Sequence, residues 1–285
     1  MKLVITGVAG FIGSHLAERS LSEGHDVLGI DCFTDYYPRS FKEQNLKRFI
    51  ENPRFEFAEG NIAEMDLMNS FNGSEVIYHL AAQAGVRASW GDQFQIYSDY
   101  NVLGTQRVLE AATKVNVKRV VYASSSSVYG DVLDFPMKET ANPKPVSPYG
   151  VSKLAAEHLC MLYKSNFNLP TVSLRYFTVY GPRQRPDMAF HKFFKAAIQG
   201  SEFTIFGNGE QTRDFTYVAD AVEATFNAGF AKGVEGEVFN IGGGCRISVN
   251  DVIKIIEKVM GEPVRYNLSD VQKGDVRHTA ADTTK

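Results

Sequence analysis

The sequence predicts an α/β fold built on a doubly wound parallel sheet, joined to a smaller, discontinuous α/β domain. Over the first 175 residues, short runs rich in β-branched residues alternate with longer stretches that suit helices. The short runs are almost continuously apolar, which is typical of parallel strands that are buried on both faces. Ligands bind such sheets at the carboxyl ends of the strands, so the residues that follow each run are the first candidates for a functional site.

Six runs are predicted to be strands of this sheet: Leu3 to Thr6, Val27 to Asp31, Phe55 to Gly60, Val76 to Ala81, Val120 to Ser124 and Val172 to Tyr176. The clearest helices between them are expected at Asn101 to Val115, where apolar residues recur on one face, and at Tyr149 to Asn166. Beyond these the alternation becomes irregular. Short strands are expected at Phe203 to Phe206 and Val238 to Ile241, and helices at Val218 to Ala231 and Val249 to Met260.

Composition and charge exclude several classes of protein. The 285 residues are 44% hydrophobic and 22% charged, which is too apolar for a disordered or collagen-like chain. The net charge of -3 offers no basic field, so we expect no nucleic-acid partner. No apolar stretch reaches the ~18 residues that a membrane helix needs, so we expect no membrane association. Three widely spaced cysteines, Cys32, Cys160 and Cys245, fit a reducing cytoplasm, and because no residues show metal-ligand spacing, no metal site is expected.

The first loop predicts a dinucleotide site. Gly7, Gly10 and Gly13 form Gly-x-x-Gly-x-x-Gly directly after the first strand, where glycine allows a tight turn and a close approach of the backbone to a pyrophosphate. Asp31 ends the second strand and suits hydrogen bonds from both ribose hydroxyls, which favours NAD over NADP. Two alternatives remain open: the glycines serve only a tight turn, or Arg39 supports the 2′-phosphate of NADP.

Later strand ends are expected to extend this site. Asn61 follows the third strand and is a candidate to bind the adenine. The fourth strand ends in Leu80, Ala81 and Ala82, which lack bulky side chains. They either let the backbone approach the cofactor closely or serve packing alone. We therefore expect residues 1–175 to form an NAD-binding domain, to which the chain returns near 214–243. Residues 176–285 are expected to form mainly a substrate-binding domain.

A second motif predicts acid–base chemistry. Tyr149 and Lys153 are four residues apart at the start of a predicted helix, so both side chains lie on one face. A phenol with a pKa of about 10 is a poor base at neutral pH, but a neighbouring ammonium stabilises the phenolate. The preceding strand ends in the serines 124–127, whose hydroxyls suit the sharing of a substrate proton. The trio predicts removal of a proton from a carbinol while hydride passes to a nicotinamide, and the alternative is a tyrosine beside a solvated lysine and a serine-rich loop.

Together with the segments Val128-Tyr129-Gly130 and Ser147-Pro148-Tyr149, these residues resemble the extended short-chain dehydrogenase/reductase family, in its nucleotide-sugar epimerase and dehydratase branch. The resemblance extends over essentially the whole chain and implies a Rossmann sheet and a homodimer formed through the helices at 101–115 and 149–166. It implies that Tyr149 transfers the proton, that Lys153 binds the nicotinamide ribose, and that Ser125, with Ser126 as second choice, assists Tyr149. The full set expected to bind NAD is Gly7, Gly10, Phe11, Ile12, Gly13, Asp31, Asn61, Ile62, Leu80, Ala81, Ala82, Asn101, Ser124, Tyr149, Lys153 and Tyr176.

The sequence also narrows the reaction. Dehydratases and decarboxylases of this family carry an acidic residue in the loop before Val-Tyr-Gly, whereas this chain has Ser126 and Ser127. The resemblance then implies a 4-epimerase, which oxidises a UDP-sugar at C4 and reduces it again on the opposite face. The stretch from 175 to 189 resembles UDP-glucuronate 4-epimerases, in which Thr178 and Arg185 match positions associated with the sugar carboxylate. A guanidinium suits a carboxylate, although a solvated loop is the alternative interpretation of this arginine.

The same resemblance places the UDP moiety against basic residues of the second half. The set expected to bind substrate is Arg87, Ser126, Thr178, Arg185, Arg213 and Asp275. Three other functions stay open: a UDP-glucose/UDP-galactose 4-epimerase, a UDP-glucuronate decarboxylase and a non-catalytic NAD-sensing regulator. The Tyr149/Lys153 pair argues against the regulator, because such proteins typically lack it.

Overall fold

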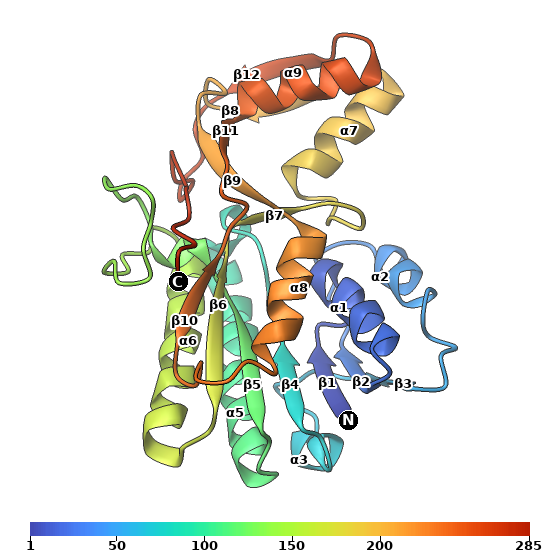
Figure 1. The fold of residues 1–285 in the computed structure, drawn as a ribbon. Helices are drawn as coiled ribbons and strands as arrows, with labels where there is room; N and C mark the ends of the chain where they lie inside the picture. Colours follow the sequence, from blue (N-terminus) through green and yellow to red (C-terminus); the bar gives the residue numbers. More distant parts are fainter.

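The computed structural model describes residues 1–285, and a seven-stranded parallel sheet lies at its centre (Figure 1). The strand order is β10-β6-β5-β4-β1-β2-β3. Its strands are β1 (Lys2–Thr6), β2 (Asp26–Asp31), β3 (Phe55–Glu59), β4 (Val76–His79), β5 (Arg119–Ser125), β6 (Thr171–Tyr176) and β10 (Val238–Ile241). Strand order reverses between β1 and β4, which opens a crevice at their carboxyl ends. The predicted doubly wound α/β fold is confirmed.

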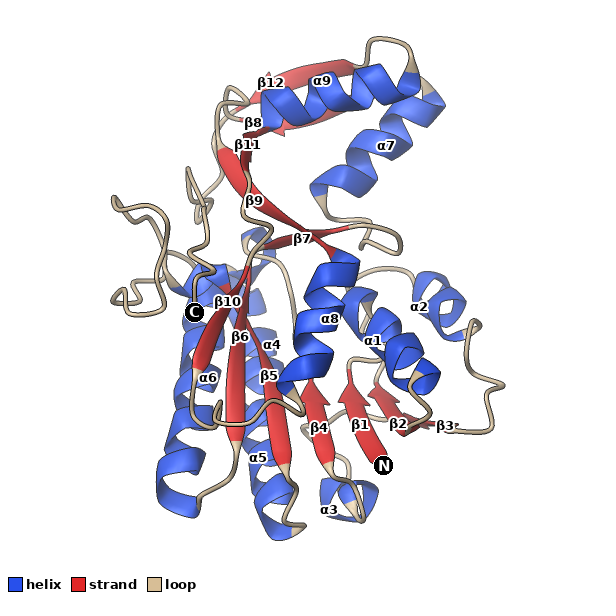
Figure 2. Cartoon of the chain, viewed as in Figure 1, coloured by secondary structure: helices blue, strands red, loops and turns tan.

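Helices cover both faces of this sheet because its strands are apolar on both sides. In β1, Leu3 and Ile5 belong to a core shared with α1 and α8, whereas Val4 belongs to a core shared with α3, α5 and α6. The two layers of helices are visible on either side of the sheet in Figure 2. The flanking helices are α1 (Phe11–Ser22), α2 (Arg39–Leu46), α3 (Leu67–Phe71), α4 (Phe94–Tyr97), α5 (Gly104–Lys114), α6 (Pro148–Phe167) and α8 (Val218–Ala228).

A smaller cap lies beyond the carboxyl edge of the sheet, at the top of Figures 1 and 2. Its own core joins Phe193 and Ala197 of α7, Ile205 of β8 and Ile253 of α9. A three-stranded sheet of order β11-β9-β7 lies between this cap and the large sheet. These elements are β7 (Thr178–Tyr180), α7 (Ala189–Gln199), β8 (Glu202–Phe206), β9 (Thr212–Tyr217), β11 (Arg246–Ser248), α9 (Val249–Met260) and β12 (Arg265–Ser269).

The second half of the chain is shared between the cap and the large sheet. β10 pairs in parallel with β6, and α8 packs against α1. Residues 218–228 and 238–241 therefore lie with the first 175 residues. The division of the chain into two domains stays a prediction.

Several elements of the cap and of the three-stranded sheet beneath it were not predicted from the sequence. β7 and β11 have three residues each, and every residue of β12 is exposed, so none of them carries a strong apolar pattern. The helix expected from Asn101 begins instead as a π-helical turn, Ser98–Leu103, and becomes α-helical at Gly104. Such turns frequently occur at functional sites. None of the helices has both the length and the apolar character needed to span a bilayer.

Candidate active site

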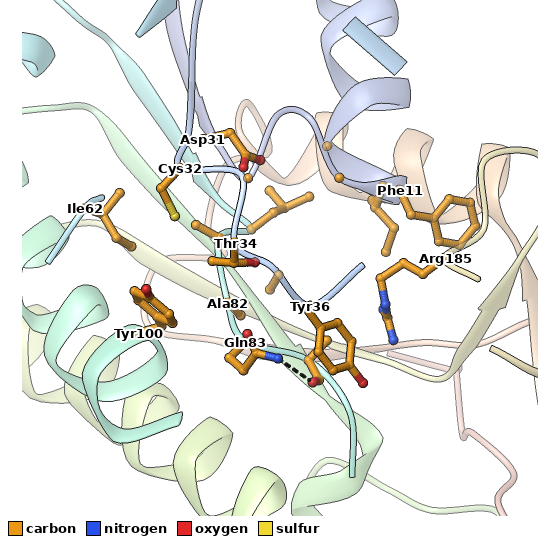
Figure 3. Close-up of a pocket in the computed structure, with 18 of the residues that line it drawn as sticks. Phe11, Asp31, Cys32, Thr34, Tyr36, Ile62, Ala82, Gln83, Tyr100 and Arg185 are labelled. Carbon is orange, nitrogen blue, oxygen red and sulfur yellow. Dashed lines mark hydrogen bonds between the residues drawn. The ribbon is translucent and has the colours of Figure 1, made fainter. Parts of the chain in front are cut away.

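One long cavity lies at the carboxyl ends of the central strands, where a doubly wound sheet binds its ligands (Figure 3). Cys32, Ile62 and Tyr100 lie toward one side of the close-up, and Phe11 and Arg185 lie toward the other. Fifteen of the sixteen residues expected to bind NAD line it: Gly7, Gly10, Phe11, Ile12, Gly13, Asp31, Asn61, Ile62, Leu80, Ala81, Ala82, Ser124, Tyr149, Lys153 and Tyr176.

The glycine turn forms the floor of the cavity and leaves no room for side chains. Gly7 has a φ of +74°, and a Cβ atom there would lie 2.8 Å from the backbone nitrogen of Ala81. A Cβ atom on Gly13 would lie 2.2 Å from the carbonyl oxygen of Gly7, so α1 packs directly on the turn. Gly10 caps α1 without any side-chain hydrogen bond, which keeps the helix N-terminus open toward the cavity. These features fit a dinucleotide, whose pyrophosphate binds backbone amides at a helix N-terminus.

Asp31 is held at the end of β2 by backbone amides. Its carboxylate accepts hydrogen bonds from the amides of Ala9 (3.1 Å) and Phe33 (2.9 Å). Burial raises the pKa of Asp31, while these amides and Lys42 act to lower it. Arg39 does not line the cavity; its guanidinium donates to both oxygens of Glu59 and is exposed. The residue considered for a 2′-phosphate is thus engaged elsewhere, whereas Asp31 lines the cavity, with Lys42 near it.

An Asp31→Asn variant is expected to lose selectivity for NAD. A neutral amide binds the ribose hydroxyls less well than a carboxylate and no longer repels a 2′-phosphate. We expect NAD affinity to fall about tenfold to 100-fold and NADP affinity to rise. Fluorescence titration of cofactor-stripped protein with both cofactors measures this, and an unchanged NAD/NADP ratio contradicts it. Glu56→Gln, at an exposed position of β3, serves as the control for loss of a nearby charge and leaves the Arg39–Glu59 pair intact.

The start of α6 brings Tyr149 to the turn that follows β5. Ser147 caps the helix by accepting a hydrogen bond from the amide of Gly150 (3.1 Å). A Cβ atom on Gly150 would lie 2.6 Å from the carbonyl oxygen of Ser127, so glycine permits a close approach of helix and turn. As a result, the turn that carries Ser125 lies directly against the start of α6, where Tyr149 is located. Burial raises the pKa of Tyr149, and Ser125 and Arg185 act to lower it.

Lys153 lies one turn further along α6 and is only 3% exposed. Its ammonium lies over the ring of Tyr122, 4.5 Å from the ring centre. Burial lowers the pKa of Lys153 to about 7, although Cys160 and Glu157 act to raise it. The amine therefore titrates near neutral pH, where a small change in its surroundings alters its charge.

Two residues expected at the cofactor have other partners. The Ser124 hydroxyl lines the cavity but donates to Glu157 (2.7 Å). Asn101 does not line the cavity; its amide group bonds the backbone N–H and C=O of Gln83 and donates to the Ser152 hydroxyl. Because Asn101 lies in the π-helical turn, it links the loop after β4 to α6. Its position suits the alignment of the site rather than direct contact with NAD.

Asn61 lines the cavity with its side chain engaged locally. Its Oδ1 atom accepts from the amide of Ala63 and its Nδ2 atom donates to Glu64, both at 3.0 Å. This hydrogen bonding holds the loop after β3 at the adenine end that the sequence predicts.

Arg185 is the one expected substrate residue that lines this cavity. Its guanidinium makes two hydrogen bonds of 3.0 Å to Asp187. Burial acts to lower the pKa of Arg185, but Asp187 outweighs it and raises the pKa, so the side chain stays cationic. Tyr36 also donates to Asp187 (3.3 Å), which joins the loop after β2 to the loop after β7.

The other expected substrate residues lie outside the lining of this cavity, and three of them form a separate group. Arg87 pairs with Asp275 (2.6 Å), and both influence the charge of Arg213, whose pKa is lowered by burial. Arg213 also donates to the carbonyl oxygen of Arg277 (3.2 Å). This cluster of two arginines and one aspartate has the chemistry expected for a diphosphate site.

Ser126 and Thr178 lie at two neighbouring edges of the site. Ser126 begins the 3-10 turn that follows β5, and Thr178 begins β7, where it pairs with Phe215. Both are partly exposed. Their roles as substrate contacts stay predictions.

Some residues of the site were not identified from the sequence. Tyr36, Lys42 and Gln83 line the cavity, and Glu157 and Asp187 bond residues that line it. Only Glu157 had a visible signal, since it follows Tyr149 and Lys153 at a further interval of four. Tyr36, Gln83 and Asp187 come from loops, where no periodicity indicates which side chains turn inward, and Lys42 comes from the short helix α2.

Known proteins resemble the chain over its whole length. The model of the NAD dependent epimerase/dehydratase family matches residues 3–242. A Bacillus subtilis protein named as an uncharacterized UDP-glucose epimerase is 46% identical over 286 residues, which cover 100% of this chain and 90% of that protein. The UDP-glucuronate 4-epimerase of Thermodesulfobacterium geofontis is 37% identical over 287 residues, which cover 99% of this chain and 88% of that protein.

A solved structure has the same fold. The crystal structure of UDP-glucuronic acid 4-epimerase from Bacillus cereus, in complex with UDP-glucuronic acid and NAD, superposes with a TM-score of 0.97 at 45% identity. The match covers 99% of this chain and 90% of that chain. With the glycine turn, Asp31 and the Tyr149/Lys153 pair around one cavity, these similarities establish that the chain belongs to the NAD dependent epimerase/dehydratase family.

Proposed function

We propose that the protein is an NAD-dependent 4-epimerase that converts UDP-glucuronate to UDP-galacturonate. The observation that carries the proposal is the placement of the Arg185 guanidinium in the same cavity as Tyr149 and Lys153. An arginine at the reacting end of the cavity suits a sugar that carries a carboxylate. The similarity to UDP-glucuronate 4-epimerases over nearly the full chain supports the same substrate.

The side chains of the site divide the reaction between them. Bound in this cavity, NAD would supply the hydride acceptor for C4 of the sugar and the donor for hydride return to the opposite face. The Oη atom of Tyr149 accepts the proton of the 4-hydroxyl and later gives it back, and Ser125 stabilises the phenolate by donating to it. Lys153 contributes positive charge that favours the phenolate. The glycine turn, Asp31 and the residues that line the cavity hold the cofactor.

The hydroxyl-rich turn after β5 favours epimerisation over elimination or decarboxylation. Residues 125–127 are serines, so this turn offers no carboxylic acid to move a further proton. A 4-keto uronic acid is a β-keto acid that loses carbon dioxide readily, and an epimerase must hold its carboxylate in an unproductive orientation. Arg185, fixed by Asp187, and Thr178 are suited to this task.

Incubation of the purified protein with UDP-glucuronate tests the proposal. Proton NMR is expected to reveal UDP-galacturonate, with no net production of NADH and no UDP-xylose, the decarboxylation product. Formation of UDP-xylose would contradict epimerisation.

A second candidate substrate is UDP-glucose. The 46% identical Bacillus subtilis relative is named as a UDP-glucose epimerase, and this observation favours the alternative. The same NMR assay with UDP-glucose decides: a higher kcat/KM for UDP-glucose than for UDP-glucuronate would replace the proposed substrate.

An Arg185→Leu variant is expected to lose the preference for the acidic sugar. Removal of a charged hydrogen-bond donor costs about 2 kcal/mol, so kcat/KM for UDP-glucuronate falls roughly 30-fold. Competition by UDP, which lacks the sugar, stays unchanged. Arg183→Leu is the matched control, because Arg183 bonds Ser14 and Glu18 on α1 and lies outside the main cavity. Equal losses in both variants would contradict the assignment.

We also propose a homodimer that forms through α5 and α6. Leu103, Val151, Leu162 and Phe167 are apolar and each about half exposed near or on these helices. Sedimentation velocity is expected to give a dimer for the wild-type protein and a monomer for Leu162→Lys; a monomeric wild type contradicts this.

The three cysteines are free thiols, which supports a cytoplasmic location.

A further inference from the structure

A buried ion pair, Glu157 with Arg175, lies next to the reacting end of the cavity and contacts one residue of its lining, Ser124. Glu157 extends the series Tyr149, Lys153 along α6, and it is 1% exposed. Its Oε2 atom accepts hydrogen bonds from the Ser124 hydroxyl (2.7 Å) and from Nε of Arg175 (3.0 Å). Its Oε1 atom accepts from Nη2 of Arg175 (2.5 Å). One carboxylate thus joins the helix that carries Tyr149 to the ends of β5 and β6.

The hydrogen bonds continue from Arg175 into the rest of the site's framework. Its Nη1 atom donates to the carbonyl oxygen of Glu139 (3.3 Å), and its guanidinium lies 4.7 Å from the ring centre of Tyr129. The Tyr129 hydroxyl donates to Asn240 (2.7 Å) on β10, and Asn240 donates to the carbonyl oxygens of Met137 and Asp282. These contacts therefore connect α6, β5, β6, β10 and two loops through one buried pair.

Stability alone does not account for such a pair. Two charges removed from water lose much of their solvation, and a well-packed apolar replacement is often as stable. The pair does fix direction: a bidentate guanidinium–carboxylate contact sets the orientation of both side chains. The residue that this contact orients is Ser124, which immediately precedes Ser125, and Ser125 acts to lower the pKa of Tyr149.

The same carboxylate influences the charge of Lys153. The titratable groups that contact the ammonium or act on its charge are Glu157 and Cys160 of α6, Tyr122 of β5 and His79 of β4. Burial raises the pKa of Cys160 to about 12 and, with Lys153, lowers the pKa of His79 to about 3, so both are neutral near pH 7. The Glu157 carboxylate is then the charged group that acts to raise the pKa of Lys153.

We propose that Glu157 and Arg175 are positioning residues for the epimerase reaction: together they fix the Ser124–Ser125 turn against Tyr149, and the Glu157 carboxylate also maintains Lys153 as a cation. The inference rests on the proposed function, since it concerns proton transfer by Tyr149. It assigns two distinct effects to one carboxylate. The hydrogen bond to Ser124 sets geometry, and the negative charge sets the protonation of Lys153.

A Glu157→Gln variant separates these effects from a purely structural role. The amide keeps the shape but loses the charge, and the expected kcat is about 10- to 100-fold lower. Loss of a negative charge weakens proton binding nearby, so both apparent pKa values of the kcat/KM profile are expected to move down by about 1 unit. Ser124→Ala removes the hydrogen bond without changing any charge; its kcat is expected to fall with the profile unmoved.

A readout that needs no turnover completes the test. Acetic anhydride modifies only the neutral amine, and peptide mass spectrometry gives the extent of acetylation at Lys153 as a function of pH. In Glu157→Gln, this acetylation is expected to begin at lower pH than in the wild type. An unmoved acetylation curve together with an unmoved kcat/KM profile overturns the charge effect, and a Glu157→Gln variant with wild-type kcat overturns the positioning role.

A double variant covers the case in which Glu157→Gln does not fold. Glu157→Gln/Arg175→Met removes both charges, and it is expected to fold, to have a reduced kcat and to shift the kcat/KM profile down as Glu157→Gln does, because the carboxylate is the partner that raises the pKa of Lys153. Full activity in the double variant also overturns the inference. Failure of the proposed function can be distinguished from failure of this inference. If the wild-type protein epimerises no UDP-sugar, the proposed function is wrong, but the acetylation curves still test the effect of Glu157 on Lys153.

Discussion

Replacing Tyr149 with phenylalanine is expected to lower kcat for epimerisation about 10³-fold. The phenylalanine ring fills the same space but has no oxygen to accept the proton of the 4-hydroxyl. Neither Ser125 nor Lys153 replaces it, because Ser125 acts on the substrate through the phenol and Lys153 lies a turn further along α6. NMR of the conversion of UDP-glucuronate gives the rate.

Binding measurements distinguish a chemical defect from a structural one. The NAD content and the affinity for UDP of Tyr149→Phe are expected to stay near wild type, since the glycine turn, Asp31 and the Arg87 cluster are untouched. Tyr97→Phe is a matched control: its ring meets the Tyr149 ring edge-on at 6.2 Å, and its hydroxyl bonds the backbone of residues 84 and 85. If Tyr97→Phe lowered kcat as much as Tyr149→Phe, the assignment of the proton to Tyr149 would be wrong.

Replacing Lys153 with methionine is expected to lower activity and to raise stability. The activity loss, about 100-fold or more in kcat, follows from the missing cation beside the phenolate. The gain in stability follows from burial. The pKa of Lys153 is about 7 in the folded protein, against 10.5 for an unperturbed lysine as in the unfolded chain, so the folded state binds the proton less tightly. Below pH 7 the whole cost of burying the ammonium is present, and methionine removes it, which is worth about 2 kcal/mol in the free energy of unfolding.

The stability difference between Lys153→Met and the wild type is expected to change with pH in one direction. The wild type is expected to gain stability from this group as the pH rises from 7 to 10.5, because the unfolded chain holds the proton over that range. The difference between Lys153→Met and wild type therefore shrinks with rising pH. Thermal unfolding of NAD-free protein measures it, with Lys164→Met on the same helix as control. A difference that grows with rising pH is incompatible with a buried ammonium.

The local motifs of the site were readable from the sequence because their geometry is set by a few consecutive residues. The glycine turn needs only a strand, a turn and a helix, and four-residue spacing places Tyr149 and Lys153 on one helical face. The parallel strands were readable for the same reason, since burial on both faces leaves a continuous apolar run.

Contacts between distant segments were not readable. Arg183 and Arg185 are two residues apart and look alike in sequence, yet only Arg185 lines the main cavity. Arg183 has a φ of +64°, so the loop turns at this residue and directs its side chain to α1. Likewise, nothing in the local pattern indicates that Arg175 meets Glu157 or that Asn101 bonds Gln83, because these pairs form only when the strands and helices are assembled.

The position of β10 at the edge of the large sheet has a consequence for synthesis of the chain. Residues 238–241 complete a sheet whose other six strands lie within the first 176 residues. While the ribosome adds the intervening residues, β6 presents an unpaired edge with open N–H and C=O groups, which is a template for wrong pairing. The nascent chain thus passes through a long interval in which its largest sheet is unfinished, and this interval is where we expect chaperones to engage it.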